Sequence, residues 1–201
     1  MSIEFLVRNY YALYDYRKKM LAEEDTEVSR WVCDKTFKIE RDIVEALTLH
    51  VHKDPVGRWL MSIEGIDAVM AAGLLTYVDI KQHQTVEDLW NFAGLGAHQK
   101  DPGLKELKTV CHQIGHSFAG RRNSFYGALF QKRCKREIDL HGETLTPGHI
   151  AQRARRHTVK MFLEGFHDAC FYMEYGKISE KQYNYEIEHP NFEMIYESRR
   201  I

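Results

Sequence analysis

The chain has 201 residues, the length of one ordinary domain with an appendage. Hydrophobic residues make up 44% and charged residues 28%, as in globular proteins that form a core. No stretch approaches the roughly 20 apolar residues of a membrane span, and the polar N-terminal segment does not resemble a secretory signal. The four cysteines form no C-x-x-C pair. We therefore expect free thiols, a reducing compartment and a cytoplasmic location.

The net charge of −1 conceals a basic segment in the middle of the chain. Residues 100–160 carry a net charge of +8, whereas residues 1–99 carry −5 and residues 161–201 carry −4. A local positive field attracts phosphate backbones whatever the net charge of the whole chain. The segment therefore favours a polyanionic partner, with an ordinary solvated helix surface as the alternative.

Only four prolines and thirteen glycines interrupt the chain, and the apolar periodicity predicts an all-α fold. Residues 3–23 show roughly heptad spacing, broken by Arg17, through Leu6, Tyr10, Leu13, Met20 and Leu21. A second helical pattern runs through Val32, Ile39, Ile43, Leu47 and His50. The two patterns predict an antiparallel helical hairpin or coiled coil over residues 1–53. It serves either as a dimerisation arm or as a hairpin packed on its own domain.

A second unit is predicted over residues 54–178 and begins with a helix-hairpin-helix pattern. A short apolar helix (56–61) and a small-residue helix (68–75) flank a turn at Gly65, where a positive φ permits a tight reversal. In such hairpins the backbone N–H groups, here those of Gly65 and Ile66, and the N-terminus of the next helix bind a phosphate.

Two carboxylates complicate the phosphate interpretation of this hairpin. Asp67 stands where the second glycine of the pattern is usual, and Glu64 adjoins Gly65. Asp67 is a good helix N-cap, but both carboxylates would repel a phosphate. The hairpin is therefore either a binding element or a packing unit.

Three further helical stretches follow. Thr85 caps a helix over residues 86–92, and the segments LKELKTVCHQIGHSF and SFYGALFQKRCKREIDL read as two more helices. Thr146 and Pro147 open a long helix that runs to about Tyr175. Residues 179–201, aromatic and acidic, are expected to form an extended strap over the core or a partner.

The long helix places His149, Arg153, Arg156 and Lys160 in one stripe opposite its apolar side. A basic stripe of this kind suits a phosphate backbone. The predicted nucleic-acid-binding residues are Gly65, Ile66, Lys100, Lys105, Arg121, Arg122, Lys132, Arg133, Arg153, Arg156, His157 and Lys160.

Catalytic and metal-binding patterns are weak. His112 and His116 lie four residues apart on a helix, but no second ligand cluster accompanies them, so we expect no metal. Phosphate-binding loops, dinucleotide fingerprints and nucleophile elbows are missing from the sequence, so we expect no cofactor. Ser117 and Ser124 lie near the basic residues, where capping or phosphate contact is the usual role. No catalytic residue is predicted.

At LMSIEGIDAVMAAGLLTYVDI and TVEDLWNFAGLG the sequence closely resembles the C-terminal domain of the transposases of the IS-one-ten insertion-sequence family. That family is RNA-guided, and its helical domain is similar to the Nop domain of box C/D ribonucleoproteins. The likeness covers about residues 55–175 and rests on residues 60–80, 90–96 and 149–171. It implies a Nop-like helical domain that binds a structured guide RNA, which directs it to DNA.

The departures from that family concern its chemistry. The transposases carry a RuvC-like carboxylate domain, for which 201 residues leave no room, and a nucleophilic serine shortly after the AGL motif. Here that position reads GAHQKDPG, and no serine lies between Ser62 and Ser117. The resemblance therefore implies a stand-alone relative, of a phage or mobile-element type, that binds without cleaving.

The leading hypothesis is a homodimeric nucleic-acid-binding protein, paired through its N-terminal helices, that grips structured RNA, duplex DNA or both. One alternative is a minimal recombinase using Ser117 or Ser124, with carboxylates supplied by a partner. Another is a phage protein–protein adaptor that acts through its N-terminal hairpin. Salt-dependent nucleic-acid affinity distinguishes the leading hypothesis from the adaptor.

Overall fold

A computed structural model describes residues 2–23, 26–96, 104–179 and 188–199. This part of the chain contains helices and no strands, so the predicted all-α fold is confirmed. No helix within these ranges has both the length and the hydropathy that crossing a membrane requires. The helices are α1 (Ile3–Glu23), α2 (Glu27–Val51), α3 (Pro55–Ser62), α4 (Ala68–Tyr77), α5 (Val86–Phe92), α6 (Lys105–Gly120), α7 (Phe125–His141), α8 (Pro147–Tyr175) and α9 (Glu193–Ser198).

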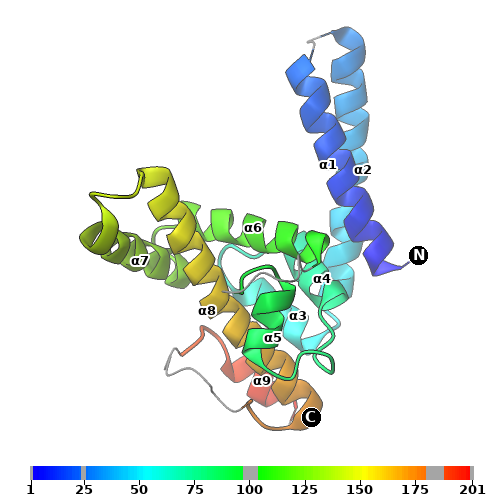
Figure 1. The fold of residues 1–201 in the computed structure, drawn as a ribbon. Coiled ribbons are helices and arrows are strands. Elements are labelled where there is room, and N and C mark those ends of the chain that lie inside the picture. Colours follow the sequence, from blue (N-terminus) through cyan, green and yellow to red (C-terminus); the bar gives the residue numbers. More distant parts are fainter. Residues whose placement is uncertain (1, 24–25, 97–103, 180–187, 200–201) are drawn as a thin grey trace.

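Helices α1 and α2 lie antiparallel and form an arm that stands out from the body formed by the other helices (Figure 1). A capping box starts α2: the Ser29 N–H donates to the Thr26 hydroxyl at 3.1 Å, and the Thr26 N–H donates to the Ser29 hydroxyl at 2.9 Å. This reciprocal pair satisfies N–H groups that the first turn of a helix leaves without partners. The short polar link can therefore reverse the chain without fraying α2.

A buried ion pair fixes the contact between the two helices of the arm. Arg17 binds Glu40 through two parallel bonds, Nε to Oε1 at 2.8 Å and Nη2 to Oε2 at 2.9 Å, and only 3% of Glu40 is exposed. The prediction that Ile39 belongs to the packing face is wrong, because Ile39 is 50% exposed and Glu40 turns inward instead. The buried face consists of Ser29, Cys33, Thr36, Glu40, Ile43, Leu47 and Val51.

The lower half of the arm shares its core with the body. Leu6, Val7 and Leu47 belong to the same buried cluster as the side chains of α4 and α6. In addition, the Tyr11 hydroxyl donates to Gln113 Oε1 on α6 at 2.8 Å. The boundary expected near residue 53 therefore separates two groups of helices but not two cores.

The α3–turn–α4 unit is part of the body and packs against α6. Asp54 caps α3 by accepting the Gly57 N–H at 3.0 Å, and Pro55 occupies the first turn, where its missing N–H costs nothing. The small residues of α4 make room for α6, since a Cβ on Gly73 would lie 2.8 Å from Val110 Cγ2. Close packing of α4 and α6 is what the Ala-Ala-Gly sequence permits.

Helix α8 is the longest helix of the body, and its predicted span from Pro147 to Tyr175 is confirmed. The Thr146 hydroxyl accepts the His149 N–H at 3.3 Å, and Gly176, with φ of +75°, ends the helix in the left-handed conformation. All residues from 158 to 169 except Lys160 are buried. Such extensive burial indicates that α8 packs against neighbours on most of its circumference.

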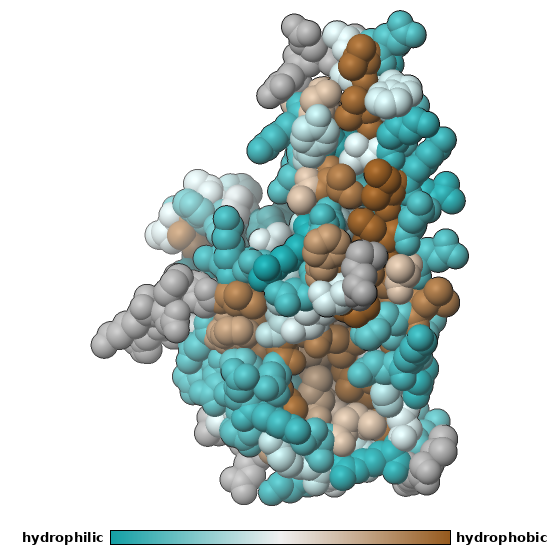
Figure 2. Space-filling model, turned by 90° about the vertical axis from the view of Figure 1, so that its right-hand side faces the viewer, coloured by the Kyte–Doolittle hydropathy of each residue, from teal (hydrophilic) through white to brown (hydrophobic). Residues whose placement is uncertain are grey.

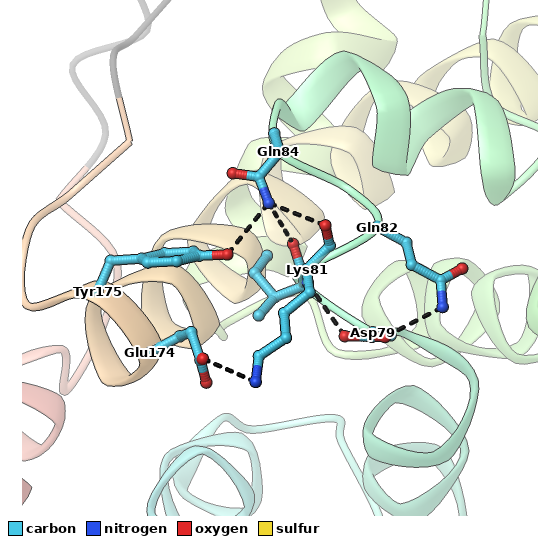
Figure 3. A network of polar contacts seen from close by, with 7 residues as sticks. Asp79, Lys81, Gln82, Gln84, Glu174 and Tyr175 are labelled. Carbon is cyan, nitrogen blue, oxygen red and sulfur yellow. Dashed lines mark hydrogen bonds and ion pairs between the residues drawn. The ribbon is translucent and has the colours of Figure 1, made fainter.

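The loop between α4 and α5 is fastened to the end of α8 by a polar network (Figure 3). Lys81 pairs with Glu174 at 2.9 Å, and Gln84 Nε2 donates to the Tyr175 hydroxyl at 3.1 Å. Asp79 holds the loop itself by accepting the Lys81 N–H at 3.0 Å. This loop leads directly into α5, so the network also sets where α5 lies on α8.

The C-terminal segment differs from its prediction. Instead of a wholly extended strap, it contains α9, whose Ile195 is fully buried. The segment is tied to α3 because Trp59 Nε1 donates to the Pro190 carbonyl at 3.0 Å. Residues 180–187 of the predicted strap lie outside the described residues.

The Arg17–Glu40 pair generates a test of the arm. Replacing Arg17 with Ala leaves the Glu40 carboxylate buried without its cation, so we expect the free energy of unfolding to fall by about 2–4 kcal/mol. Urea unfolding followed by circular dichroism measures this loss. The Arg17→Leu, Glu40→Leu double variant removes both charges and is expected to recover most of it. Equal stability of Arg17→Ala and the unmodified protein would contradict the structural role of the pair.

Candidate nucleic-acid interface

Helices α6 and α8 cross closely because a glycine lies at the crossing. A Cβ added to Gly115 would lie 3.1 Å from Val159 Cγ2 and 3.4 Å from Arg155 Cβ. The missing side chain lets the backbone of α6 approach α8 directly beneath the Arg155 side chain. The crossing therefore sets where Arg155 stands relative to the side chains of α6.

An open groove lies beside this crossing, with a cavity of about 320 Å³. We call it the α6–α8 groove, and the loop after α5 closes one of its sides. Its lining residues are Gly94, Leu95, Lys108, Cys111, His112, Gly115, Gln152, Arg155, Arg156 and Val159. The volume lies near the lower end of the range of small-molecule pockets, roughly 300–1,000 Å³. It is large enough for one phosphate group with part of its sugar.

The groove is electropositive. Lys108, Arg155 and Arg156 contribute cations, and no carboxylate is present among the described residues that line it. The His116 ring lies next to this groove, with its centroid 4.4 Å from that of the His112 ring. Burial lowers the pKa of His116, and the positive charge of Arg155 lowers it further. An anion entering the groove would be attracted by the same charges.

The predicted stripe on α8 is largely engaged in contacts within the protein. Arg156 Nη2 donates to the Gly96 carbonyl at 2.7 Å, which holds the loop after α5 against the groove. Lys160 Nζ lies 4.6 Å from the centre of the Trp90 ring, a cation–π contact. Burial and the neighbouring Arg156 lower the pKa of Lys160. These two cations shape the groove wall and the base of α5.

A buried carboxylate binds two of the other predicted cations. Glu137, on α7, is fully buried and forms ion pairs with Arg133 on its own helix and with Arg153 on α8. The Arg153 Nε to Glu137 Oε2 distance is 2.9 Å. This arrangement fastens α7 to α8, because a buried carboxylate is stable only when it is paired. Arg133 and Arg153 therefore have a structural role in addition to any contact with a ligand.

The remaining predicted residues are distributed over several surfaces. His157 is half-buried between α7 and α8, near the charges of Arg133, Arg136 and Lys160. The exposed residues are Lys105, Arg121, Arg122 and Lys132, at the start of α6, in the link to α7 and on α7. Lys100 lies outside the described residues.

The hairpin turn is packed against the end of α6. Gly65 has φ of +109°, as its position in the turn requires, and a Cβ there would lie 3.0 Å from Phe118 Cδ1. Ile66 is buried, and its N–H donates to the Ile63 carbonyl. The Asp67 carboxylate accepts the N–H groups of the first turn of α4. These contacts occupy the Ile66 N–H and the first N–H groups of α4, so the hairpin packs against the body through groups that the sequence offered to a phosphate.

Neither serine near the basic residues is placed as a nucleophile. The Ser117 hydroxyl donates to the Gly65 carbonyl at 2.6 Å and accepts from Arg121 Nη1 at 2.6 Å. Ser124 is buried and caps α7 by accepting the Gly127 N–H at 3.0 Å. The bonds of both hydroxyls described here go to structural partners, and no imidazole or carboxylate is among them.

Among the described residues, no three or more His, Cys, Asp or Glu side chains come together in a group that could hold a metal ion. The rings of His112 and His116 lie next to each other on one face of α6, tilted by 49°. Cys111, beside them in sequence, is buried, and burial raises the pKa of its thiol to about 12. A thiol that resists deprotonation is a poor metal ligand.

Lys108, His112 and Arg155 line the groove but are not among the binding residues predicted from the sequence. The signal for two of them was present, because Lys105, Lys108 and His112 follow one another at helical spacing along α6. Arg155 could not be chosen over Arg153 from the sequence, since both lie on the same basic helix. Only the crossing at Gly115 brings Arg155 together with the side chains of α6.

Comparison of the chain with protein-family models, with curated proteins and with solved structures finds no match. The functional assignment therefore depends on the geometry and charge of the site itself.

The environment of His157 predicts a pH dependence of stability. Burial, reinforced by the charges of Arg133 and Arg136, lowers its pKa from the ordinary 6.5 to about 4. His157 is protonated less readily in the folded protein than in the unfolded chain. Its contribution to the free energy of unfolding is therefore complete above pH 6.5 and is lost as the pH falls towards 4.

Between pH 6.5 and pH 4 we expect the free energy of unfolding to fall by roughly 1 kcal/mol more in the unmodified protein than in the His157→Gln variant. The effect is no larger because His157 is only half-buried. Chemical unfolding at pH 7, 5.5 and 4.5 measures the difference. Parallel profiles for the two proteins would refute the assignment.

Proposed function

We propose that the protein binds the phosphate backbone of a nucleic acid in the α6–α8 groove and performs no chemistry of its own. One observation carries this proposal. The groove collects Lys108, Arg155 and Arg156 around an open cavity that no described carboxylate lines. Positive charges gathered in one place repel one another, and an anion bound among them would relieve that repulsion.

The chemistry of the lining favours phosphate among anions. Arg155 offers a planar guanidinium that can bind two phosphate oxygens at once, and Lys108 adds a point charge. Gln152 and His112 supply further hydrogen-bonding groups in the lining. A mixture of charged and neutral donors is typical of contacts to a nucleic-acid backbone, which fix the position of the protein without reading sequence.

The groove supports the proposal better than the basic stripe of α8 does. Arg153 is paired with buried Glu137, and Lys160 lies against Trp90. The exposed cations Arg121, Arg122 and Lys132 extend the basic surface beyond the groove. In this proposal they add backbone contacts, while the groove accepts one phosphate group.

The ligand class follows from the size of the groove. A cavity of about 320 Å³ does not admit a duplex, whose backbone must pass across its mouth. Single-stranded loops and bulges of a structured RNA present separate phosphates that can enter such a cavity. We therefore propose a structured, guide-type RNA as the first ligand to test, with duplex DNA bound along the outer cations. A relationship to the IS-one-ten helical domain would account for both.

The first experiment identifies the nucleic acid. The protein is purified from its native operon with and without nuclease, and any nucleic acid that co-purifies is sequenced. A discrete RNA supports the guide-type ligand, and heterogeneous fragments support a general backbone binder. Clean protein that binds neither RNA nor DNA at low salt would overturn the proposal and favour the adaptor hypothesis.

The second experiment tests the groove. We expect the Lys108→Gln, Arg155→Gln double variant to bind at least about tenfold more weakly, because both cations that would hold the phosphate in the groove are lost. The slope of log affinity against log salt should fall by about 1, since one neutralised phosphate is lost. Fluorescence anisotropy with the identified RNA, or a structured RNA of known fold, at several salt concentrations measures both quantities.

A matched control removes the same charge elsewhere. The Lys18→Gln, Lys19→Gln double variant alters two exposed lysines of the arm and is expected to keep both the affinity and the salt slope. If the two double variants lose affinity equally, binding depends on overall charge and not on the groove. Urea unfolding of each variant checks that the fold is unchanged.

A further inference from the structure

Helix α2 carries a second apolar face that nothing in the described chain covers. Four exposed large apolar side chains lie on this face of α2: Val28, exposed by 68%, Trp31 by 61%, Ile39 by 50% and Leu49 by 63%. Figure 2 shows apolar side chains gathered along the arm. Single exposed apolar residues are ordinary, but a continuous stripe of them indicates an interaction surface.

The spacing of these residues places them on one side of the helix. Steps of three and four residues, the spacing of a coiled-coil seam, connect the set Val28, Trp31, Lys35, Ile39, Asp42, Ala46 and Leu49. All seven are exposed. We call this set the outer seam. The buried residues of α2, from Ser29 to Val51, form a separate seam that faces α1. One helix therefore carries two seams, of which α1 occupies one.

The two halves of the outer seam are complementary to each other when one copy is reversed. The terminal positions of the seam are both large aliphatic residues, Val28 and Leu49. The next two inward are complementary in size, with Trp31 at one end and Ala46 at the other. A second helix laid antiparallel on this seam would place Trp31 of each copy over Ala46 of the other. Such alternation of large and small side chains gives close packing.

The two charged residues of the outer seam fit the same arrangement. Lys35 and Asp42 are equally far from the centre of the seam, so an antiparallel copy places each beside the opposite charge of the other. Lys35 Nζ already lies 5.7 Å from the centre of the Trp31 ring, which holds its charge on the seam. Polar residues within an apolar seam weaken association and in return specify register and partner.

We propose that the outer seam binds a second copy of this chain, with two α2 helices antiparallel about a two-fold axis close to Ile39. A symmetric dimer requires that a residue contacting a second residue be contacted by it in return. The outer seam meets this requirement in size and in charge. An unrelated helix would have no reason to match a pattern that is complementary to itself, so the observations favour a second copy.

The pairing places the two bodies at opposite ends of a four-helix stalk made of two arms. Each body keeps its own α6–α8 groove, so the dimer presents two grooves at a fixed separation. The pairing itself does not depend on whether the groove binds nucleic acid. If it does, two linked sites bind one long ligand more tightly than either site alone.

The first test measures mass as a function of concentration. After nuclease treatment and in high salt, sedimentation equilibrium or light scattering is expected to show a dimer. Ile39→Glu places two carboxylates near the two-fold axis and is expected to give a monomer at micromolar concentration. Phe37→Glu is the matched control, because Phe37 is also 50% exposed but lies on the opposite side of α2 against Arg17. This variant should remain a dimer.

The second test fixes the register by charge exchange. In the antiparallel pairing, Lys35→Asp alone, or Asp42→Lys alone, turns two attractions into two repulsions, which should raise the dimer Kd about tenfold. The Lys35→Asp, Asp42→Lys double variant restores both attractions and should recover the original Kd. In a parallel pairing each charge faces its own copy, so the single variants would associate as tightly as the unmodified protein.

Three results would overturn the proposal. A protein that stays monomeric at all accessible concentrations would mean that a different partner covers the seam. Loss of the dimer in Phe37→Glu but not in Ile39→Glu would place the interface on another face. Unchanged Kd values for both single charge variants would exclude the antiparallel register. Circular dichroism of each variant confirms that the arm remains helical.

Discussion

The aromatic cluster around Phe162 is the contact on which the rest of the body depends. Phe162, at the middle of α8, is fully buried and stacks on Trp59 of α3 with ring centroids 6.4 Å apart. It also meets Phe118 of α6 and Tyr126 of α7 edge-on, each at 5.4 Å. Aromatic side chains contribute the largest buried areas in protein cores. A single cluster thus orients four helices, and the α6–α8 groove exists because their crossing is fixed.

Buried carboxylates decide which of the many arginines are available to a ligand. Glu40 forms an ion pair with Arg17 in the arm, and Glu137 forms ion pairs with Arg133 of α7 and Arg153 of α8. Each carboxylate compensates positive charge and joins two helices, α1 to α2 through Glu40 and α7 to α8 through Glu137. The basic segment therefore supplies both the attachments of the fold and the charge of the groove. Arg155, in the groove wall, belongs to the second group.

The arm and the body are joined more firmly than two separate domains would be. The base of the arm lies in the same core as α4 and α6, and Tyr11 bonds directly to α6. The outer seam runs along the part of α2 that this core leaves exposed. A rigid junction of this kind means that pairing of two arms would also fix the relative positions of two grooves.

The sequence by itself determined the helices from α1 to α8, because capping residues and apolar periodicity are local signals. Thr146 with Pro147 started α8 where predicted, and Thr85 started α5. Only the tertiary structure decided which face of each helix meets which neighbour. Periodicity could not tell that Glu40 turns inward and Ile39 outward, since that choice depends on Arg17 in another helix. Nor could it identify the binding cations, because a groove forms where distant helices cross.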